Sequence, residues 1–394
     1  MKIIYITTAM EEGDYNAFVT QWSVALNPSK QNFNLKLIKA LSEKNEIEVF
    51  SIRPFSRTLC QIYYLDRASR DDKNIKWHYL AIPRYRVFKF PACKSQTLDI
   101  LDHMDLVDTV VLTETINPIC LHVANAIQDK YKIPVVGIVT ESPSNIRNTT
   151  KDFSKRIFKM GQRFDGYLAL TSGLNTVFNP NNKPNLIFEG VVNNDFPPRI
   201  TNEFGRYIFY KGSLQDNSGI YQLIDAFKNV EDPALRLLIS GHHADNTKLN
   251  KAIESDSRIV NLGILNSKKS IQLEMNALIN IDPRPYSEDL DRFSIPDNIV
   301  EYLDSGVITI CVKNSKIKKH FPENVIWSKS GDTANLYESI TKVLSLTDEE
   351  RQNIGKSAKQ KAQELYSQKK IADSINKFLE ELLWKKPRFA AFFN

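Results

Sequence analysis

The chain has 394 residues, of which 42% are hydrophobic and 25% are charged, and its formal net charge is +6. This is the composition of a globular protein and excludes a disordered chain, and the length suits two domains better than one. The modest positive charge favours phosphates and nucleotides as partners, but it is too small and too spread out for a nucleic-acid binder.

Four cysteines are scattered along the chain without the CxxC spacing of a zinc site, which favours free thiols in a reducing compartment. The segment Met1–Met10 predicts a β-strand, because its apolar run is too short for a signal peptide. No stretch reaches the roughly twenty apolar residues that a membrane-spanning helix needs. We therefore expect a cytoplasmic protein, and peripheral contact with the inner face of a membrane stays open.

In the first half, short runs of β-branched and aromatic residues alternate with segments of helical periodicity. The strands expected there are Lys2–Thr7, Glu46–Ile52, Thr109–Thr113, Pro134–Val139 and Tyr167–Thr171. Between the first two, Phe33, Leu37, Ile38 and Leu41 fall at helical spacing. This alternation predicts parallel βαβ units.

Two segments rich in Asn and Pro, Asn179–Asn185 and Asn193–Phe204, indicate the approach to an interdomain linker. A second series of strands is then expected at Tyr207–Lys211, Arg236–Ser240, Ile259–Leu262, Ile279–Asp282 and Val307–Val312. Ile220–Phe227 has the periodicity of a helix with one apolar face. The chain is therefore expected to comprise an N-terminal α/β domain, a C-terminal α/β domain and a helical tail, over residues 1–198, 199–370 and 371–394.

Gly212 comes directly after a predicted strand of the second half. Open α/β sheets bind ligands at the carboxyl ends of their strands, and a glycine there lets the backbone approach a phosphate closely. Lys211, Gly212 and Ser213 are therefore candidate phosphate-binding residues, together with Gly241 after the next strand. A glycine in this place more often simply ends a strand.

A more informative segment follows the strand that ends at Asp282. It predicts a loop carrying Arg284 and Arg292, and then a helix that begins at Pro296 with Ser294 as its cap. The N-terminus of such a helix attracts a diphosphate through its N–H groups and partial positive charge, and the arginines add full charges. The other residues expected around the anion are Ser294, Ile295, Pro296, Asp297 and Asn298.

Three glutamates are candidate ligands of a nucleotide sugar. Glu301 lies about one turn into the predicted helix, where its carboxylate could accept two hydrogen bonds from a ribose diol. The pattern alone, however, fits a solvated helix residue better. Glu114 and Glu141 each follow a strand of the first half and would face a cleft between the domains. Either could contact the acceptor or the donor sugar, and each equally fits a charge at a helix N-terminus.

Two groups of potential metal ligands do not predict a metal site. Asp289 and Asp291 have the Asp-x-Asp spacing, but they are expected in a loop of the second half, where a metal role is not favoured. His242 and His243 are adjacent, so their side chains point in different directions. We expect neither a metal nor a cofactor.

Two segments combine basic and aromatic residues. Ile82–Phe90 alternates apolar with cationic residues, which favours slightly an amphipathic strand over a surface that touches anionic lipid or a lipid-linked acceptor. The C-terminal Trp384–Phe393 cluster allows the same two interpretations.

Several of these segments together resemble the retaining GT-B glycosyltransferases of the family-4 type that act in bacterial cell-surface polysaccharide synthesis. The resemblance covers most of the chain and is most specific in 279–306. Its motifs are Gln31–Leu41, Ser51–Pro54, Tyr210–Leu214, Asp282–Pro285 (Asp-Pro-Arg-Pro), Phe293–Pro296 (Phe-Ser-Ile-Pro) and Glu301–Gly306 (Glu-Tyr-Leu-Asp-Ser-Gly). The resemblance implies an α/β protein of the GT-B fold, with two Rossmann-like domains facing across a cleft and a C-terminal helix packing back on the N-terminal domain.

The resemblance also implies a function: metal-independent transfer of a sugar from a nucleotide diphosphate donor, expected to be a UDP-sugar, to a glycan or lipid-linked acceptor. Arg284, Glu141 and Glu114 are the expected catalytic residues. The sequence departs from the family pattern at several expected charges. Phe293 replaces a glutamate, Asn298 replaces a lysine, and serines at 213 and 218 replace an arginine and a lysine.

These departures keep alternatives open. One is a catalytically weakened transferase-like subunit that binds a partner or an acceptor. A nucleotide-sugar epimerase is less favoured, because no convincing set of acids and a histidine is present. A nicotinamide dehydrogenase is disfavoured, since no GxGxxG follows the first strand.

Overall fold

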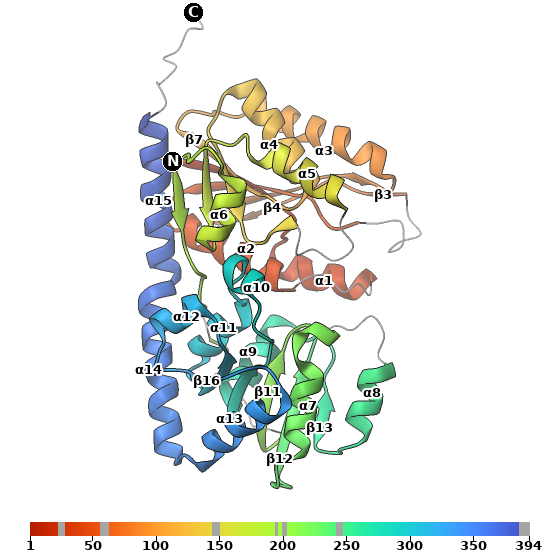
Figure 1. Ribbon diagram of the computed structural model, residues 1–394. Coiled ribbons are helices and arrows are strands. Elements are labelled where there is room, and N and C mark those ends of the chain that lie inside the picture. The colour runs from red at the N-terminus through yellow and green to blue at the C-terminus, as the bar shows by residue number, and fades with distance from the viewer. Residues whose placement is uncertain are drawn as a thin grey trace, which may run out of the picture. The chain divides into compact units, whose positions relative to one another are not determined.

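The computed structural model describes residues 1–22, 28–55, 63–143, 150–193, 196–198, 203–241 and 247–385. The chain forms two compact α/β units (Figure 1). The first unit comprises Met1–Glu189, Arg292–Ser294 and the C-terminal segment from Gln368, and the second comprises Gly190–Asp291 and Ile295–Ser367. Cys60, His242, His243 and the tail beyond Lys385 lie outside the described residues.

The first unit is built on an eight-stranded sheet with the strand order β10-β9-β8-β7-β1-β2-β5-β4. The strands are β1 (Lys2–Thr7), β2 (Glu46–Ser51), β4 (Ala68–Asp72), β5 (Ile75–Tyr79), β7 (Thr109–Glu114), β8 (Val135–Val139), β9 (Gly166–Ala169) and β10 (Asn185–Ile187). All neighbours are parallel except β4 and β5. In the middle of the sheet, Tyr5 of β1 lies opposite Val49 and Leu112. Because the central strands are buried on both faces, they are continuous apolar runs, which is why they are predictable.

Helices connect these strands, as the alternating pattern predicts, and one further helix, α15, comes after the second unit along the chain. They are α1 (Glu12–Trp22), α2 (Pro28–Ser42), α3 (Arg86–Leu101), α4 (Pro118–Tyr131), α5 (Lys151–Gly161), α6 (Ser172–Phe178) and α15 (Gln368–Lys385). Local sequence sets their ends. The side chain of Asn117, for example, accepts hydrogen bonds from the N–H groups of Ile119 and Cys120 at the start of α4, and Pro118 occupies the first turn. A separate antiparallel pair, β3 (Tyr64–Leu65) and β6 (Ile82–Pro83), precedes α3.

The C-terminal helix α15 packs within the first unit, as the resemblance implies. Lys44 Nζ lies 2.7 Å from Asp373 Oδ1, and Asn45 Nδ2 donates to Asn376 Oδ1 at 2.9 Å. A Cβ at Gly166 of β9 would lie only 3.0 Å from the ring of Phe378. The last helix therefore completes the unit that the first residues begin.

The second unit has a six-stranded, fully parallel sheet with the order β13-β12-β11-β14-β15-β16. Its strands are β11 (Arg206–Lys211), β12 (Leu235–Ser240), β13 (Ile259–Asn261), β14 (Ile279–Asp282), β15 (Thr309–Val312) and β16 (Ile326–Ser328). Its helices are α7 (Ile220–Lys228), α8 (Thr247–Glu254), α9 (Ser267–Asn276), α10 (Glu288–Phe293), α11 (Asp297–Ser305), α12 (Ser315–His320), α13 (Thr333–Ser345) and α14 (Asp348–Tyr366), and the boundary between the units falls within α10.

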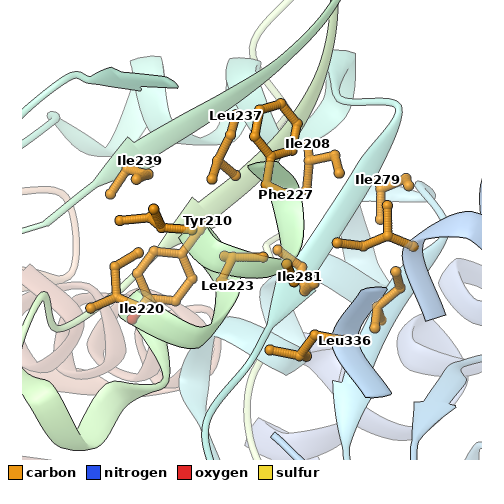
Figure 2. Packing of buried hydrophobic residues seen from close by; sticks show 14 of the residues in the cluster. Ile208, Tyr210, Ile220, Leu223, Phe227, Leu237, Ile239, Ile279, Ile281 and Leu336 are labelled. Atoms are coloured by element: carbon orange, nitrogen blue, oxygen red, sulfur yellow. The ribbon is translucent and has the colours of Figure 1, made fainter. Parts of the chain in front are cut away.

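Alternate side chains of the central strand β11 belong to two hydrophobic clusters, one on each face of the sheet. Ile208 and Tyr210 pack with α7 and α13 in the cluster shown in Figure 2, whereas Tyr207 and Phe209 pack on the other face of the sheet. Side chains alternate between the faces of a strand, so a strand covered on both sides must be apolar throughout. This double burial holds the carboxyl end of β11, where Lys211 lies, in a fixed place.

Two sequence-based expectations about elements are wrong in detail, and the strands β4, β5, β10 and β16 were not predicted. Ile82–Phe90 is not an amphipathic strand: it contains the two-residue strand β6 and then the first turn of α3. The segment after Asp282 is not wholly a loop, because α10 forms within it and carries Asp289, Asp291 and Arg292. The last strand, β16, was not predicted, since Ile326–Ser328 is too short to show a period.

Two further observations concern the membrane and the thiols. Within the described ranges, no helix has the length and apolarity to cross a bilayer. Cys93, Cys120 and Cys311 are buried free thiols.

Candidate active site

The loops at the carboxyl ends of β11, β12 and β14 pack against each other through glycines. A Cβ at Gly241 would lie 1.9 Å from the carbonyl oxygen of Gly212, and one at Gly219 would lie 2.3 Å from that of Pro283. Gly219 also has φ +79°, which favours glycine. The N–H of Gly212 donates to Ser240 O at 2.9 Å. The glycines thus bring three loops together at one edge of the sheet, including the two that hold Gly212 and Arg284.

Lys211 is the centre of a charged cluster at this edge. Its Nζ lies 2.6 Å from Glu274 Oε1 and 2.5 Å from Glu301 Oε2. The Lys211 side chain is 20% exposed, against 1% for Glu274 and 12% for Glu301. Burial acts to lower the pKa of Lys211, but the two carboxylates outweigh it and raise that pKa. Burial, together with the negative charge of Glu301, raises the pKa of Glu274 even though Lys211 acts to lower it. One cation is thus shared by two carboxylates with little solvent around them.

The start of α11 is tied to the same strand end. Asn298 donates from Nδ2 to the carbonyl oxygen of Lys211 at 2.5 Å, and the N–H of Lys211 donates to the Tyr302 hydroxyl at 2.7 Å. Ile295 and Ile299 are buried and anchor the turn. The first turn of α11 therefore lies at the carboxyl end of β11, as the sequence predicts.

The predicted cap of this helix is wrong. The helix begins at Asp297, with Pro296 at the N-cap position, and Ser294 groups with the first unit. Proline has no side-chain acceptor for the N–H groups of the first turn. The N–H groups in the first turn of α11 therefore receive no hydrogen bond acceptor from the side chain of residue 296. The side chain of Asp297 lies outside the described part of the structure.

Arg284 follows β14 and is held by the strand end. Its N–H donates to Asp282 Oδ1 at 3.1 Å, and its guanidinium lies 3.4 Å from Asp282 Oδ2. Arg284 also influences the pKa of Tyr210. Burial and the negative charge of Asp282 raise that pKa, and the positive charge of Arg284 acts to lower it. The Tyr210 hydroxyl in turn donates to Ser213 O at 2.6 Å. The structure thus brings Arg284 and Ser213 to one place.

Arg292 makes its described backbone contacts with the first unit. Its carbonyl oxygen accepts a hydrogen bond from Thr171 Oγ1 at 3.0 Å, and a Cβ at Gly173 would lie 2.5 Å from the same oxygen. Its guanidinium lies over the ring of Phe293, 5.0 Å from the centroid. Arg292 and Ser294 therefore belong to the first unit, whereas the sequence analysis grouped them with Arg284.

In the first unit, Glu114 is a buried and fully engaged carboxylate. It accepts hydrogen bonds from Thr7 Oγ1 at 2.5 Å and from the N–H of Thr8 at 2.7 Å, and Lys30 Nζ lies 2.5 Å from its other oxygen. Burial acts to raise the pKa of Glu114, but Lys30 and the hydrogen bonds outweigh it and lower that pKa. Glu114 therefore joins the ends of β1 and β7 to α2 as an ionised group.

Glu141 differs from Glu114 although it lies near the same lysine. It is exposed after the end of β8. The surrounding protein displaces enough solvent to raise the pKa of Glu141, and the attraction of Lys30 offsets this only in part. Of the two acids, Glu141 is thus the one whose proton is held more tightly than that of an ordinary glutamate.

Two residues of the site were missed by the sequence analysis. Glu274 lies in the last turn of α9 and pairs with a lysine 63 positions earlier in the chain. Tyr302 follows Glu301 and was treated only as part of a motif. Nothing in the local pattern marks Glu274 as buried and charged, because its partner is supplied by a distant strand.

No group of three His, Cys, Asp or Glu side chains suited to a metal ion occurs among the described residues.

Comparison with known proteins identifies the class of domain. Residues 193–361 match the family model described as Glycosyl transferases group 1. No curated protein matches the sequence significantly. The matched segment contains the whole Lys211–Glu301 region of the second unit.

Solved structures resemble the chain over nearly its full length. Sucrose-phosphate synthase from Thermosynechococcus elongatus has a TM-score of 0.66 at 11% identity, covering 98% of this chain and 100% of that one. Anabaena HepE in complex with UDP has a TM-score of 0.63 at 13% identity, covering 97% and 100%. The E. coli trehalose-6-phosphate protein bound with UDP-2-fluoro glucose has a TM-score of 0.64 at 8% identity, covering 97% and 99%. At such identities the likeness establishes the fold. The protein therefore has the GT-B fold of glycosyltransferases, and its second unit carries a glycosyl transferases group 1 domain.

Proposed function

We propose that this protein is a retaining glycosyltransferase that moves a sugar from a UDP-sugar to a glycan or lipid-linked acceptor in cell-surface polysaccharide synthesis. The observation that supports it most directly is the carboxyl edge of the second sheet. There the Glu301 carboxylate is held by Lys211, beside the first turn of a helix and near a loop that carries Arg284. Solved structures of the same fold hold UDP or a UDP-sugar analogue.

The diphosphate and the ribose of a UDP-sugar each have a matching group at this edge. The diphosphate suits the N–H groups of the first turn of α11, with the backbone of Gly212 and Ser213 and the guanidinium of Arg284. The ribose diol suits the carboxylate of Glu301, which accepts hydrogen bonds from both hydroxyls. The other expected ligands, Gly241 and the turn from Ile295 to Asn298, shape the loops around it. Lys211 then acts on Glu301 rather than on phosphate, which changes the role that the sequence suggested.

The reaction requires stabilisation of the leaving group. The bond from the anomeric carbon to the donor phosphate oxygen breaks, and a bond from that carbon to an acceptor hydroxyl oxygen forms. Negative charge grows on the departing UDP, so cationic and N–H groups at the diphosphate lower the barrier more than they strengthen ground-state binding. Arg284 is the side chain that we assign to this task.

The two acids of the first unit take different roles in this proposal. Glu141, with its raised pKa, suits transfer of the acceptor proton or a hydrogen bond to a sugar hydroxyl. Glu114 is already bound by Lys30 and two threonines, so we assign it the task of fixing Lys30.

The direct test is calorimetric titration of the full chain with UDP, followed by a screen of UDP-sugars for donor loss. Glu301→Ala should weaken UDP binding by about 1.5–3 kcal/mol, as for a lost charged hydrogen bond. Glu338→Ala, at an exposed position of α13, is the matched control and should leave UDP affinity unchanged. Equal affinity of the Glu301 variant and the wild type would remove Glu301 from the site.

One observation favours a second candidate, a transferase-like subunit without catalytic activity. Lys211 is engaged by two carboxylates, and Asn298 bonds to the backbone where the resembling family has a lysine. Fewer cations are then offered to a diphosphate. UDP binding without turnover of any donor in the screen would favour this candidate, and turnover would exclude it.

A further inference from the structure

Large exposed hydrophobic side chains gather at one place in the first unit. Among the described residues, five of them lie on β3 and around the first turn of α3: Tyr63 at 70% exposure, Tyr64 at 49%, Tyr85 at 47%, Val87 at 72% and Phe88 at 57%. The remaining large exposed hydrophobics are separated along the chain: Val107, Ile187, Ile264, Tyr286, Tyr337 and Trp384. A contiguous group of this kind on a folded protein marks a contact surface.

The group is built on ordered structure. β3 pairs with β6, with Tyr64 opposite Pro83 and Leu65 opposite Ile82, and Leu65 and Ile82 are buried. The N–H of Arg84 donates to Tyr63 O at 2.8 Å, so the two segments are also joined next to that pairing. Figure 1 shows β3 and α3 in the same part of the first unit. The buried side chains of Leu65 and Ile82 hold the β3–β6 pair in place, while Tyr63 and Tyr64 stay exposed to solvent.

The charges around the α3 part of this group have one sign, whereas an exposed aspartate and arginine, Asp66 and Arg67, follow β3. From Leu80 to Leu98 the sequence contains Arg84, Arg86, Lys89 and Lys94 and no acidic residue. Arg86 and Lys94 are exposed, and the guanidinium of Arg84 lies over the Tyr63 ring, 5.5 Å from its centroid. Lys89 is turned inward and donates to the carbonyl oxygen of Phe55. A partner would therefore meet two kinds of side chain here: aromatic or aliphatic ones, and cationic ones.

We propose that the β3–α3 patch, formed by Tyr63, Tyr64, Tyr85, Val87 and Phe88 with Arg84 and Arg86, docks the protein on an anionic lipid bilayer. Tyrosine has an apolar ring and a polar tip, which suits the boundary between headgroups and acyl chains. Val87 and Phe88 supply apolar area that can enter that boundary, and the arginines attract anionic headgroups. A lipid surface suits the patch because its anionic headgroups complement the arginines while the headgroup–acyl boundary takes up the apolar side chains.

The test is flotation of the full chain with vesicles of phosphatidylcholine and phosphatidylglycerol, with pure phosphatidylcholine vesicles alongside. The wild type should float with the anionic vesicles, and added salt should release it. The double variant Val87→Ser, Phe88→Ser should lower the vesicle affinity about ten-fold or more, because it removes the apolar area. Arg86→Gln should lower binding to anionic vesicles only.

Matched controls separate the patch from general effects. Val107→Ser changes a valine of the same 72% exposure elsewhere in the first unit, and Arg236→Gln removes an exposed cation in the second. Both should bind vesicles as the wild type does. UDP titration of every variant, without vesicles, reports on the donor site independently, so a failure of the proposed function leaves this test readable.

Two outcomes would overturn the proposal. One is a wild type that floats with neither kind of vesicle. The other is a double variant that floats as well as the wild type. A wild type that sediments as a dimer, becomes monomeric in the double variant and ignores vesicles would assign the patch to a second copy of the chain instead.

Discussion

At the scale of single residues, the most informative group is the cation that Glu274 and Glu301 share. Two carboxylates with so little exposure repel each other strongly unless a cation lies between them. Lys211 offsets this repulsion, and its ammonium group holds the Glu301 carboxylate in place before any ligand arrives. The position of Lys211 was predictable from the glycine that follows it, but its task was not, because Glu274 was hidden in an ordinary helical pattern.

The first prediction concerns this cation. Its raised pKa keeps Lys211 charged well beyond neutral pH, and its stabilising effect is lost only as the pH rises through that pKa. Lys211→Met should lower the free energy of unfolding by about 3 kcal/mol near neutral pH, because two buried carboxylates lose their partner. The deficit should shrink in acid, starting above the pH at which an ordinary glutamate takes up its proton (about 4.3), because the pKa of Glu274 is raised. Urea unfolding at the two pH values measures both effects.

A surface pair provides the control for that measurement. Lys329 pairs with Glu338 at high exposure on both sides, so Lys329→Met should change the stability by less than about 1 kcal/mol. A deficit in Lys211→Met that stays constant with pH would show that packing, not charge, is responsible.

The second prediction concerns Glu141. As the acceptor of a proton it must be ionised, so kcat/KM should rise with pH through its pKa. Because that pKa is raised, the rise should lie above the pH expected from an ordinary glutamate, about 4.3. Glu141→Gln should abolish the rise and lower the rate by about 100-fold or more. Glu46→Gln, at an exposed position of β2, should keep the rise in place, and a profile unchanged by Glu141→Gln would exclude the role.

At the scale of elements, the contacts between loops decide the shape of the site. Gly241 and Gly219 allow the loops after β12 and β14 to approach the segment around Gly212 and the start of α7. Of these two glycines, the sequence predicted Gly241 as a phosphate contact. The structure shows that they are needed first for packing.

The third prediction follows from that packing. Gly241→Ala would place a Cβ 1.9 Å from the Gly212 carbonyl oxygen, so the two loops must separate. We expect a loss of about 1–3 kcal/mol in stability together with weaker UDP binding. Gly13→Ala, where the neighbouring atom is the end of the flexible Glu11 side chain, should be neutral or stabilising. Thermal unfolding and UDP titration on both variants check this, and wild-type behaviour of Gly241→Ala would refute it.

Strands were easier to predict than the segments between them. Runs such as Lys2–Thr7 and Tyr207–Lys211 are buried on both faces, and burial leaves a continuous apolar signal. Ile82–Phe90 misled because its alternation of apolar and cationic residues resembles a strand. That alternation arises instead from a short strand followed by a helix whose exposed side carries apolar side chains. Whether such a segment forms a strand or a helix depends on its tertiary contacts and not on its local periodicity.

At the scale of the whole molecule, the first unit is not continuous in sequence. It needs α15, whose residues follow the entire second unit. The resemblance predicted this return of the chain. Periodicity alone could not have done so, because it shows a helix without showing its partner.

The fourth prediction tests this dependence. Ending the chain after Ser367 removes five buried apolar side chains of α15: Ile371, Ala372, Ile375, Leu379 and Leu382. The larger of them contribute about 1.5–3 kcal/mol each, and their sum is comparable with the stability of a whole domain. The first unit should then become sensitive to protease while the second unit still binds UDP. A chain ending at Lys385 should resist protease as the full chain does, and equal resistance of the shorter chain would contradict the prediction.

The late position of α15 has a consequence for how the protein is made. A ribosome releases the β-strands of the first unit long before it has synthesised their last helix. During that interval the faces of α2 and β9 that α15 covers stay in water, while the second unit has all of its own residues and can fold. The unit that is translated first is therefore the one completed last. A chaperone that shields apolar surface is expected to bind the faces of α2 and β9 that α15 later covers.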